Sequence, residues 1–352
     1  MSSTTADKIN YLLDTKEEIR QAINEKFVDV PTSATFRSYA DSIRAIPTGN
    51  KMCRFIIGTI TAGWTEKDCD YLCDGVDDQE EINAAIQALP STGGEIKVLD
   101  GTYNITTSIN IDKEGVTFGG CGQSTIFKRM WNSTALNQGV IELSKNYSTL
   151  KYFVIDGNKS LHNSNYNHGI DSKYQGLRFI VIKNTTIINC SGCGIQAIYL
   201  SMMEIISNLI MDNILNGIRA DIYSGVIANN ICYKNGESGI NTSAGYSISI
   251  VGNRSEYNAK YGIYVNSDRS TTCGNTCNNN EIAGICTHNS IATSIIGNTC
   301  IRGKGTASDY TSSQRTIEAR MASAQCVIVG NTCLGKAPTI AGTNCIVENN
   351  LS

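Results

Sequence analysis

The sequence predicts an all-β solenoid, a parallel β-helix, from three observations. An asparagine returns every 22 to 24 residues through the middle of the 352-residue chain. A second asparagine follows five residues later, and Gly-Ile follows four or five residues after that. Small or apolar residues stand two positions before and after the leading asparagine, which is the period of a strand. The leading asparagines are Asn184, Asn208, Asn230, Asn253, Asn275 and Asn298.

A fixed period of this size is the sequence signature of stacked repeats. Leucine-rich repeats have a similar period, but their leucine consensus is missing here. Three short strands and three turns per coil of ~22 residues give a parallel β-helix with coils ~4.8 Å apart. The asparagines then stack as a ladder of amides, and the glycine of each Gly-Ile is expected to adopt backbone angles that other residues resist. The second asparagines are Asn189, Asn213, Asn235, Asn258 and Asn280, and the Gly-Ile isoleucines are Ile195, Ile218, Ile240, Ile263 and Ile285.

This repeat resembles the β-helix of the pectate-lyase-like superfamily, which also carries an internal asparagine ladder. The resemblance implies a single-stranded right-handed parallel β-helix, and we expect about 10–12 coils. A second resemblance concerns the start of the solenoid and points to phage tailspike-like domains. It rests on Asp74-Gly-x-Asp-Asp, Ile82-Asn-Ala-Ala-Ile86, Gly93-Gly-x-Ile96 and Gly101-Thr-Tyr103.

Residues 5–46 precede the solenoid and are typical of two short amphipathic helices. The first carries an apolar stripe from Ile9 to Ile23, and the second runs from Thr35 to Ile46 and ends before Pro47. Helices this small cannot bury an independent core. They either fold onto the β-helix or form an attachment module whose apolar stripes meet a partner or sister chains, and we favour the module.

A resemblance supports the attachment module. The segments Lys8–Ile23 and Thr35–Ile43 are similar to the N-terminal segment of many bacteriophage tail and baseplate proteins. The predicted organisation is therefore an N-terminal helical attachment or oligomerisation module at 1–50 and a right-handed parallel β-helix at 51–352.

The first coil is expected to be covered by a helix at about residues 78–90, because solenoids protect their open ends. Asp78 is expected to cap this helix, with Glu81 completing a capping box. Strands are predicted at Arg54–Ile60, Glu95–Leu99, Gly115–Phe118, Val140–Leu143 and Tyr152–Ile155.

The spacing breaks after Asn298, where the next leading asparagine is Asn331, 33 residues on. Residues 302–313 are therefore expected to form an inserted loop, and Thr316-Ile317 to replace Gly-Ile. Asn331 and Asn349 are expected to continue the ladder.

Charge and composition exclude several classes of function. A net charge of −3 and a pI near 5.7 argue against a nucleic-acid-binding surface. The apolar runs are too short to span a membrane. The polar N-terminus lacks the apolar core of a secretory signal, which predicts synthesis in a cytoplasm if Met1 is the native start.

The fourteen cysteines are expected to be reduced thiols rather than disulfides or a zinc site. Cys232, Cys277, Cys300 and Cys333 each follow a leading asparagine by two residues, where we expect the side chain to face inward. No cofactor and no metal site is predicted.

Two polar columns follow the Gly-Ile steps and are predicted to face outward as a ribbon. Such a ribbon of amides, hydroxyls, charges and one aromatic ring suits an extended sugar chain, although any solvated strand face is polar. The expected substrate-binding residues are Lys173, Gln196, Arg219, Asn241, Tyr264, Asn266, His288 and Glu318.

Cleavage of a sugar chain would need two carboxyl groups. Asp171 and Asp221 are the predicted catalytic pair, two coils or ~10 Å apart at the backbone. Arg219 would keep Asp221 ionised. Asp156 and Glu142 are further candidate acids, each expected to be structural.

The resemblance implies the fold rather than an activity. Polygalacturonases carry neighbouring aspartates, Gly-His-Gly and Arg-x-Lys, and pectate lyases carry clustered acids for calcium. None of these patterns occurs in this sequence.

Three hypotheses follow. The leading one is a phage or prophage tail-associated protein that binds cell-surface polysaccharide, located in the virion tail, attached to tail or baseplate proteins through residues 1–50, and homotrimeric as tailspike-like proteins commonly are. The second is a polysaccharide depolymerase, either a hydrolase or a lyase. The third is a non-catalytic structural baseplate component.

Overall fold

The structure is a computed structural model of the whole chain. It describes residues 5–24, 30–35, 38–39, 42, 53–133, 138–172, 174–301 and 313–352. The chain divides into two compact units, Met1–Met52 and Cys53–Ser352. No helix in the described part of the chain is long and apolar enough to cross a membrane.

The N-terminal unit contains helix α1 (Thr5–Asn24). The last turns of α1 bury Ile23 with Val30 and Tyr39, and Ile19 packs against them. The first turns instead leave Ile9 52% exposed, and Leu12 and Leu13 are similarly exposed. The apolar stripe therefore has two halves, one packed within the unit and one facing solvent. Most of the second predicted helix, 35–46, lies outside the described residues.

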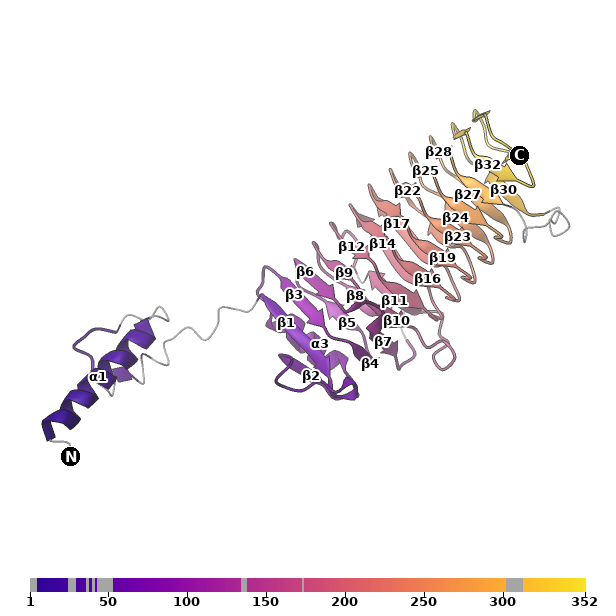
Figure 1. Cartoon of the computed structure of the whole chain (residues 1–352). Coiled ribbons are helices and arrows are strands. Elements are labelled where there is room, and N and C mark those ends of the chain that lie inside the picture. Colours follow the sequence, from indigo (N-terminus) through magenta and orange to yellow (C-terminus); the bar gives the residue numbers. More distant parts are fainter. Residues whose placement is uncertain are drawn as a thin grey trace. The chain divides into compact units, whose positions relative to one another are not determined.

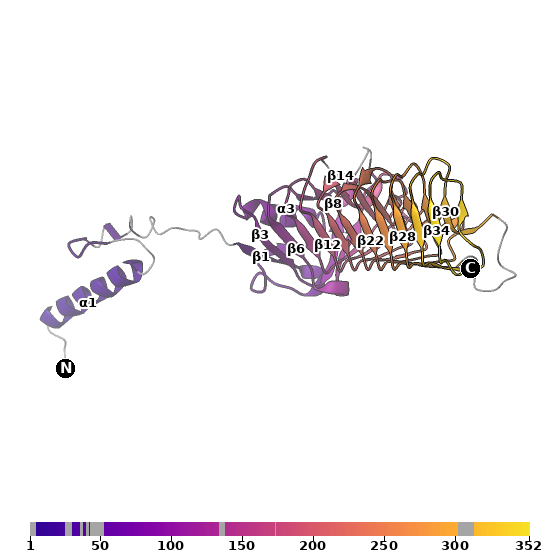
Figure 2. The same cartoon turned by 90° about the horizontal axis from the view of Figure 1, so that it is seen from above.

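The second unit is a parallel β-helix built from three sheets, as the repeat predicts (Figures 1 and 2). Helix α3 (Gln79–Ala88) precedes most of the coils, and the short 3-10 turns η1 (Ile60–Ala62) and η2 (Gly122–Ser124) lie in connections. In spatial order the first sheet contains β2 (Tyr71–Cys73), β1 (Arg54–Thr59), β3 (Gly94–Val98), β6 (Val116–Gly119), β9 (Thr149–Lys151), β12 (Val181–Lys183), β15 (Glu204–Ile206), β18 (Val226–Ala228), β22 (Ser249–Val251), β25 (Thr271–Cys273), β28 (Ser294–Ile296), β31 (Val327–Val329) and β34 (Ile346–Glu348).

The other two sheets follow the same order along the solenoid. The second contains β4 (Gly101–Ile105), β7 (Thr125–Arg129), β10 (Val154–Asp156), β13 (Thr186–Ile188), β16 (Leu209–Met211), β19 (Ile231–Tyr233), β23 (Arg254–Glu256), β26 (Thr276–Asn278), β29 (Thr299–Ile301) and β32 (Thr332–Leu334). The third contains β5 (Ile109–Ile111), β8 (Gln138–Leu143), β11 (Asn167–Ser172), β14 (Ile195–Ser201), β17 (Ile218–Tyr223), β20 (Ile240–Thr242), β24 (Tyr261–Val265), β27 (Ala283–Thr287), β30 (Arg315–Ala319) and β33 (Thr339–Ile340), with β21 (Gly245–Tyr246) beside β17.

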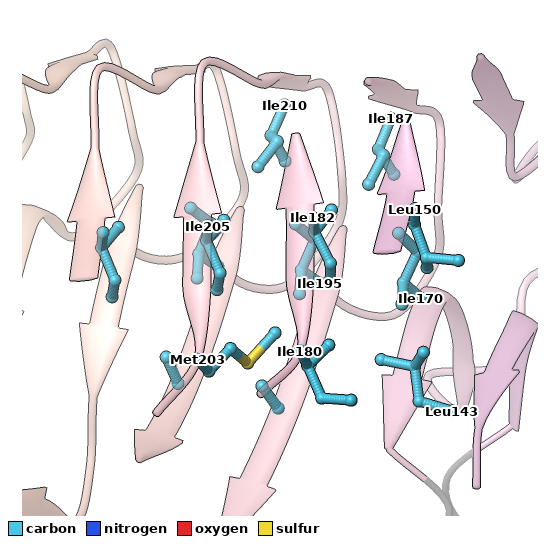
Figure 3. Packing of buried hydrophobic residues seen from close by; sticks show 14 of the residues in the cluster. Leu143, Leu150, Ile170, Ile180, Ile182, Ile187, Ile195, Met203, Ile205 and Ile210 are labelled. Carbon is cyan, nitrogen blue, oxygen red and sulfur yellow. The ribbon is translucent and has the colours of Figure 1, made fainter. Parts of the chain in front are cut away.

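Stacked isoleucines and leucines fill the interior. Leu150, Ile182 and Ile205 are in register on successive coils of the first sheet and have no exposed surface. Figure 3 shows these side chains one behind another inside the solenoid. The predicted inward column of Cys232, Cys277, Cys300 and Cys333 is confirmed, since each of these residues is fully buried. All fourteen cysteines carry free thiols.

The leading asparagines form a continuous buried ladder. Each side-chain Nδ2 donates to the Oδ1 of the next asparagine at 2.8–3.0 Å. The ladder runs through Asn208, Asn230, Asn253, Asn275, Asn298, Asn331 and Asn350. A second ladder connects Asn213, Asn235, Asn258 and Asn280. The predicted last member, Asn349, is wrong by one residue: Asn349 has φ 53° and Asn350 takes the ladder position.

The first repeat is also displaced by one residue. Asn184 and Asn189 have φ 54° and 56°, the left-handed conformation that asparagine tolerates. The ladder positions belong instead to Thr185 and Cys190, whose N–H groups donate to Asn208 and to the second-ladder asparagine. The 24-residue spacing from Asn184 to Asn208 is therefore one residue too long, because Asn184 lies one position before the ladder position on its coil.

Close packing, rather than an unusual φ, explains the Gly-Ile step. The isoleucines are buried. The glycines before them do not have positive φ, so the predicted reason for the glycine is wrong. A Cβ on Gly217 would lie 2.6 Å from the carbonyl oxygen of Gly239, and one on Gly262 would lie 2.6 Å from that of Gly284. Glycine is required because neighbouring coils approach too closely for a side chain.

Helix α3 packs Ile82, Ala85 and Ile86 into the core, but its predicted capping box is wrong. The Asp78 side chain makes no hydrogen bond to the helix N-terminus. Its carboxylate accepts from the N–H groups of Gly75 and Asn104 at 2.7 and 2.6 Å. Asp78 therefore connects the segment before the helix with β4, although the two are distant in sequence.

Two other expectations meet different outcomes. The predicted strand at 152–155 is divided, because Tyr152 has φ 60° and separates β9 from β10. Thr316-Ile317 does replace Gly-Ile, since Ile285 and Ile317 are in register. Most of the predicted inserted loop, residues 302–312, lies outside the described residues.

Candidate functional site

The outer side of the third sheet carries one polar residue per coil in strict register. We call this surface the third-sheet face. Its central column consists of Asn110, Glu142, Asp171, Gln196, Arg219, Asn241, Tyr264, Cys286, Glu318 and Thr339. The register confirms that the predicted binding residues after Gly-Ile form a line along the solenoid.

The column is only partly accessible. Arg219, Asn241, Tyr264 and Glu318 are half-buried, as are Asn266 and His288 of the second predicted column. The remaining members differ from the predicted outward-facing ribbon, because Asp171, Gln196, Asp221 and Cys286 are buried. Lys173 lies outside the described residues.

The predicted catalytic pair is not brought together. Asp221 is in register with Ile198, whereas Asp171 is in register with Gln196. The Asp221 carboxylate accepts from the N–H groups of Ser243 and Ala244 at 2.9 and 3.1 Å, and it lies 3.7 Å from the Arg219 guanidinium. These contacts occupy Asp221 within a turn.

Asp171 instead lies beside Glu142, on the adjacent coil. Burial raises the pKa of Asp171 to about 7, a hydrogen bond from Gln196 opposes the rise, and the negative charge of Glu142 adds to it. The Oδ1 atom accepts from Gln196 Nε2 at 3.4 Å, and the buried Oδ2 has no hydrogen-bond partner. Glu142 accepts from the Ser108 hydroxyl at 3.1 Å. Burial and the negative charge of Glu142 thus both favour the protonated form of Asp171.

A surface hollow occupies the third-sheet face around β20 and β24. We call it the tyrosine hollow. Its lining residues come from five consecutive coils and combine aromatic rings, amides and charges. They are Asn216, Glu237, Ser238, Asn241, Lys260, Tyr261, Tyr264, Ile282 and Arg320.

The two tyrosines of this hollow pack against each other, with Tyr264 half-buried and Tyr261 buried. Their ring centroids are 5.0 Å apart with 35° between the ring planes. The Tyr264 hydroxyl lies 2.6 Å from His288 Nδ1. The Arg320 guanidinium lies 5.4 Å from the centre of the Tyr261 ring and donates to the Tyr261 hydroxyl. Each ring is therefore held by a hydrogen bond at its hydroxyl.

Ion pairs surround the tyrosines. Lys260 pairs with Glu237 at one side of the hollow. At the other side Glu318 pairs with two arginines, with Arg320 Nε at 3.3 Å and Arg315 Nε at 3.6 Å. Glu318, predicted to bind substrate directly, is thus engaged in orienting arginines.

Sequence reasoning found only part of this hollow. It selected Asn241, Tyr264 and His288 as substrate-binding residues; the first two line the hollow, and His288 contacts the Tyr264 hydroxyl. It missed Asn216, Ser238 and Tyr261, which directly precede the glycine of Gly-Ile in three successive coils. The polar or aromatic nature of that position was an available signal.

Two other groupings of polar residues lie in the second unit. A second hollow on the same sheet is lined by Asn110, Asp112, Ser144, Lys145 and Tyr174. Among the described residues, Cys73, Asp78 and Glu81 bring possible metal-ligand atoms within 4.8 Å of one another. Both Asp78 oxygens already accept backbone hydrogen bonds, so this group fits a structural role better than a metal centre.

Comparison with known proteins identifies the fold. Residues 91–273 match the model of a family described as a right handed beta helix region. No curated protein matches the sequence.

Three similar solved structures illustrate the range of right-handed β-helix proteins. The A-module of mannuronan C-5 epimerase AlgE4 from Azotobacter vinelandii has a TM-score of 0.61 and 17% identity over 84% of this chain and 96% of that chain. The DFA-IIIase of Arthrobacter chlorophenolicus A6 has a TM-score of 0.62 and 13% identity over 84% and 86% of the two chains. The enzymatically active domain of tailspike protein 2 from bacteriophage CBA120 has a TM-score of 0.62 and 15% identity over 74% of this chain and 41% of that chain. Identities this low carry the fold alone.

Proposed function

This chain belongs to the right-handed β-helix family, and we propose that it binds a polysaccharide along the third-sheet face, with the tyrosine hollow as the principal contact. The single observation that carries the proposal is the pairing of Tyr261 and Tyr264 in a hollow lined by amides and charges. A sugar ring offers one face of C–H groups, which packs on an aromatic ring, and hydroxyls, which bond to amides and charged groups. The hollow supplies both kinds of contact.

The linear arrangement of the face supports an extended ligand. Successive in-register residues lie ~4.8 Å apart along the solenoid. Arg219 and Asn241 are half-buried neighbours in the column, and they offer guanidinium and amide donors beside the tyrosine hollow. A polymer lying along this part of the column would thus meet polar groups on successive coils.

The biological setting that we propose is a phage or prophage tail. The N-terminal segment resembles tail and baseplate proteins, and a similar fold is named as a tailspike protein. The exposed Ile9, Leu12 and Leu13 of α1 give residues 1–50 an apolar surface suited to tail proteins or sister chains. A homotrimer located in the virion tail is the expected assembly. Light scattering of the full chain tests it, and a monomer would contradict it.

A glycan array of bacterial surface polysaccharides tests the proposed binding. The wild-type chain is expected to retain one or more polymers, and Tyr264→Ala is expected to weaken binding roughly tenfold through loss of stacking and of the contact with His288. Tyr233→Ala is a matched control, because Tyr233 packs edge-on against Tyr257 beside the second sheet. No retention by the wild-type chain, or equal weakening by both variants, would reject the proposal. A purely structural baseplate role predicts the first of these results.

A second candidate function is cleavage of the bound polysaccharide, and the Glu142–Asp171 pair favours it. Glycoside hydrolysis uses two carboxyl groups, one of them with a raised pKa, and here Glu142 lies on the coil adjacent to Asp171, whose pKa is raised. Neither residue is more than 4% exposed, so a glycan would have to displace the side chains that cover them. This burial ranks cleavage below binding.

Product analysis separates the two functions. The retained polymer is incubated with the wild-type chain and with Asp171→Asn, and both reducing ends and unsaturated sugars are measured. Cleavage predicts products from the wild-type chain and none from the variant. Binding alone predicts an unchanged polymer with both proteins.

A further inference from the structure

We infer that the tyrosine hollow selects a sugar that carries an anionic group, with Arg320 as its ligand. The inference rests on the proposed function and names the substrate class for the same site. It begins with the ion pairs of the hollow and of the strand beside it.

Positive charge exceeds negative charge at this place. Lys260 and Glu237 neutralise each other across the hollow. Arg315 and Arg320, by contrast, share the single carboxylate of Glu318. Three cationic side chains therefore face two carboxylates, in a chain whose formal net charge is −3. A local positive charge on a net acidic protein attracts anions to one place rather than to the whole surface.

Arg315 and Arg320 also have more hydrogen-bond donors than Glu318 has acceptors for them. Each oxygen of Glu318 meets one arginine Nε, and the Arg315 Nε lies beyond hydrogen-bond range of its oxygen and has no hydrogen-bond partner. Arg320 also donates to the Tyr261 hydroxyl. A guanidinium group offers five N–H donors in a planar fork that fits carboxylate or phosphate oxygens. Arg320 lines the hollow and retains 35% of its side-chain exposure, so part of this fork faces the ligand space.

The aromatic rings place the anion within one sugar unit of the stacking surface. The Arg320 guanidinium lies 5.4 Å from the centre of the Tyr261 ring, and the Tyr264 ring is 5.0 Å from that of Tyr261. A ring that packs on the tyrosines thus carries its substituents to Arg320. A uronate carboxylate and a sugar phosphate share this chemistry, and a neutral hexose lacks it.

The test uses ligands that differ only in charge. Polyuronates and phosphate-linked glycans are presented on one surface beside their carboxyl-reduced or dephosphorylated forms, together with neutral dextran. We expect the anionic form of at least one polymer to bind at least tenfold more tightly than its neutralised form, as for other charge-assisted hydrogen bonds. The class that loses affinity on neutralisation identifies whether carboxylate or phosphate is the source.

Arg320→Ala should weaken binding of the anionic form about tenfold more than it weakens binding of the neutralised form. Glu318 still pairs with Arg315 in this variant, so no carboxylate is left alone. Arg254→Ala is the matched control, since Arg254 also pairs with a glutamate two residues away, Glu256, but lies on a strand of the second sheet. Far-ultraviolet circular dichroism and the melting temperature of each variant report folding.

Two results would overturn the inference while the proposed function stands. One is equal binding of the charged and neutralised forms, and the other is a loss in Arg320→Ala that is the same for both forms. Retention of no polymer at all would reject the proposed function, and the inference would fall with it.

Discussion

The early coils and the later coils of the solenoid fill the same interior with different chemistry. Up to β10, aromatic rings occupy the core: Tyr103, Phe118, Phe127 and Phe153 pack with ring centroids 5.4–6.0 Å apart. From β13 onward no ring is among the fully buried hydrophobic residues of the described coils. Isoleucines, cysteines and the two asparagine ladders take their place. The early coils are stabilised chiefly by large buried side chains, and the later coils are stabilised by hydrogen bonds that recur on every coil.

The connections differ in the same way. In the early coils the fully buried Arg129 donates to the carbonyl oxygens of Gln138 and His168 at 2.9 and 2.8 Å, and its guanidinium stacks 3.7 Å from the Trp131 ring. In the later coils one asparagine per turn donates these hydrogen bonds to buried carbonyl oxygens. The buried backbone groups of a long connection need hydrogen-bond partners particular to that connection, whereas the same residue type can pair those groups in every short turn. The sequence therefore repeats regularly where the turns are short.

The largest expected effect is loss of one ladder amide. Asn253→Leu removes the acceptor of the Asn230 amides and the donor to Ile227 and Asn275. Because several buried polar groups lose their partners at once, we expect about 5 kcal/mol lower stability in urea unfolding. Asn229→Gly is the control, since Asn229 has φ 56° and an exposed side chain. An equal loss of stability in the two variants would contradict the conclusion that the ladder hydrogen bonds stabilise the later coils.

The corresponding change in the early coils removes a ring. Phe127 contacts the rings of Tyr103, Phe118 and Phe153, so Phe127→Ala should cost about 4 kcal/mol through the cavity that it leaves. Hydrogen exchange should localise the loss of protection to the early coils, because coils of a solenoid interact chiefly with their neighbours. Uniform loss of protection through β32 would show instead that the two regions unfold as one.

The third prediction concerns pH dependence at the point where the regions meet. The pKa of Asp171 is raised to about 7 in the folded chain, so the folded state binds this proton more tightly than the unfolded state does. Its stabilising contribution is present below the ordinary pKa near 4 and is lost as the pH rises to about 7. Asp171→Asn should remove this dependence and stabilise the chain at pH 8 by on the order of 3 kcal/mol relative to wild type.

Urea midpoints at pH 4.5 and pH 8 measure the effect, and Asp156→Asn is the control, because Asp156 is a half-buried carboxyl in β10 of the second sheet. The prediction fails if the wild type and Asp171→Asn lose stability in parallel between these two pH values.

The smallest expected effect distinguishes two asparagines that look alike in sequence. Asn184→Gly should change stability by less than about 1 kcal/mol, because glycine accepts the φ of 54° and the ladder position belongs to Thr185. Differential scanning calorimetry beside Asn208→Gly, in which the ladder loses a member, gives the comparison. A loss as large as that of Asn208→Gly would place Asn184 in the ladder after all.

The repeat in the sequence sufficed to predict the coil, the inward cysteines and the polar column, because each depends on a pattern that recurs with the stacking period. The errors at Asn184, Asn189 and Asn349 share one cause. A residue in the left-handed conformation precedes each ladder position, and asparagine is favourable at both positions. The residue type alone therefore does not show which of the two positions belongs to the ladder.

The candidate site was predicted less completely, since it depends on contacts between coils. Asp171 is adjacent to Glu142 only because β8 and β11 pair in this register. The connection between them is irregular in length, so no period in the sequence aligns the two carboxyls. Arg320 and Tyr261 are 59 residues apart in sequence and meet through the same kind of stacking.

By itself the sequence determined that this chain winds into stacked coils, since a strand period within a fixed repeat has few other ways to bury its apolar side chains. Only the tertiary structure decided which polar groups of the third-sheet face are buried, which are paired and which remain open to a ligand. The physical reason is that burial and pKa depend on neighbours from other coils, and the lengths of the intervening connections decide which neighbours those are.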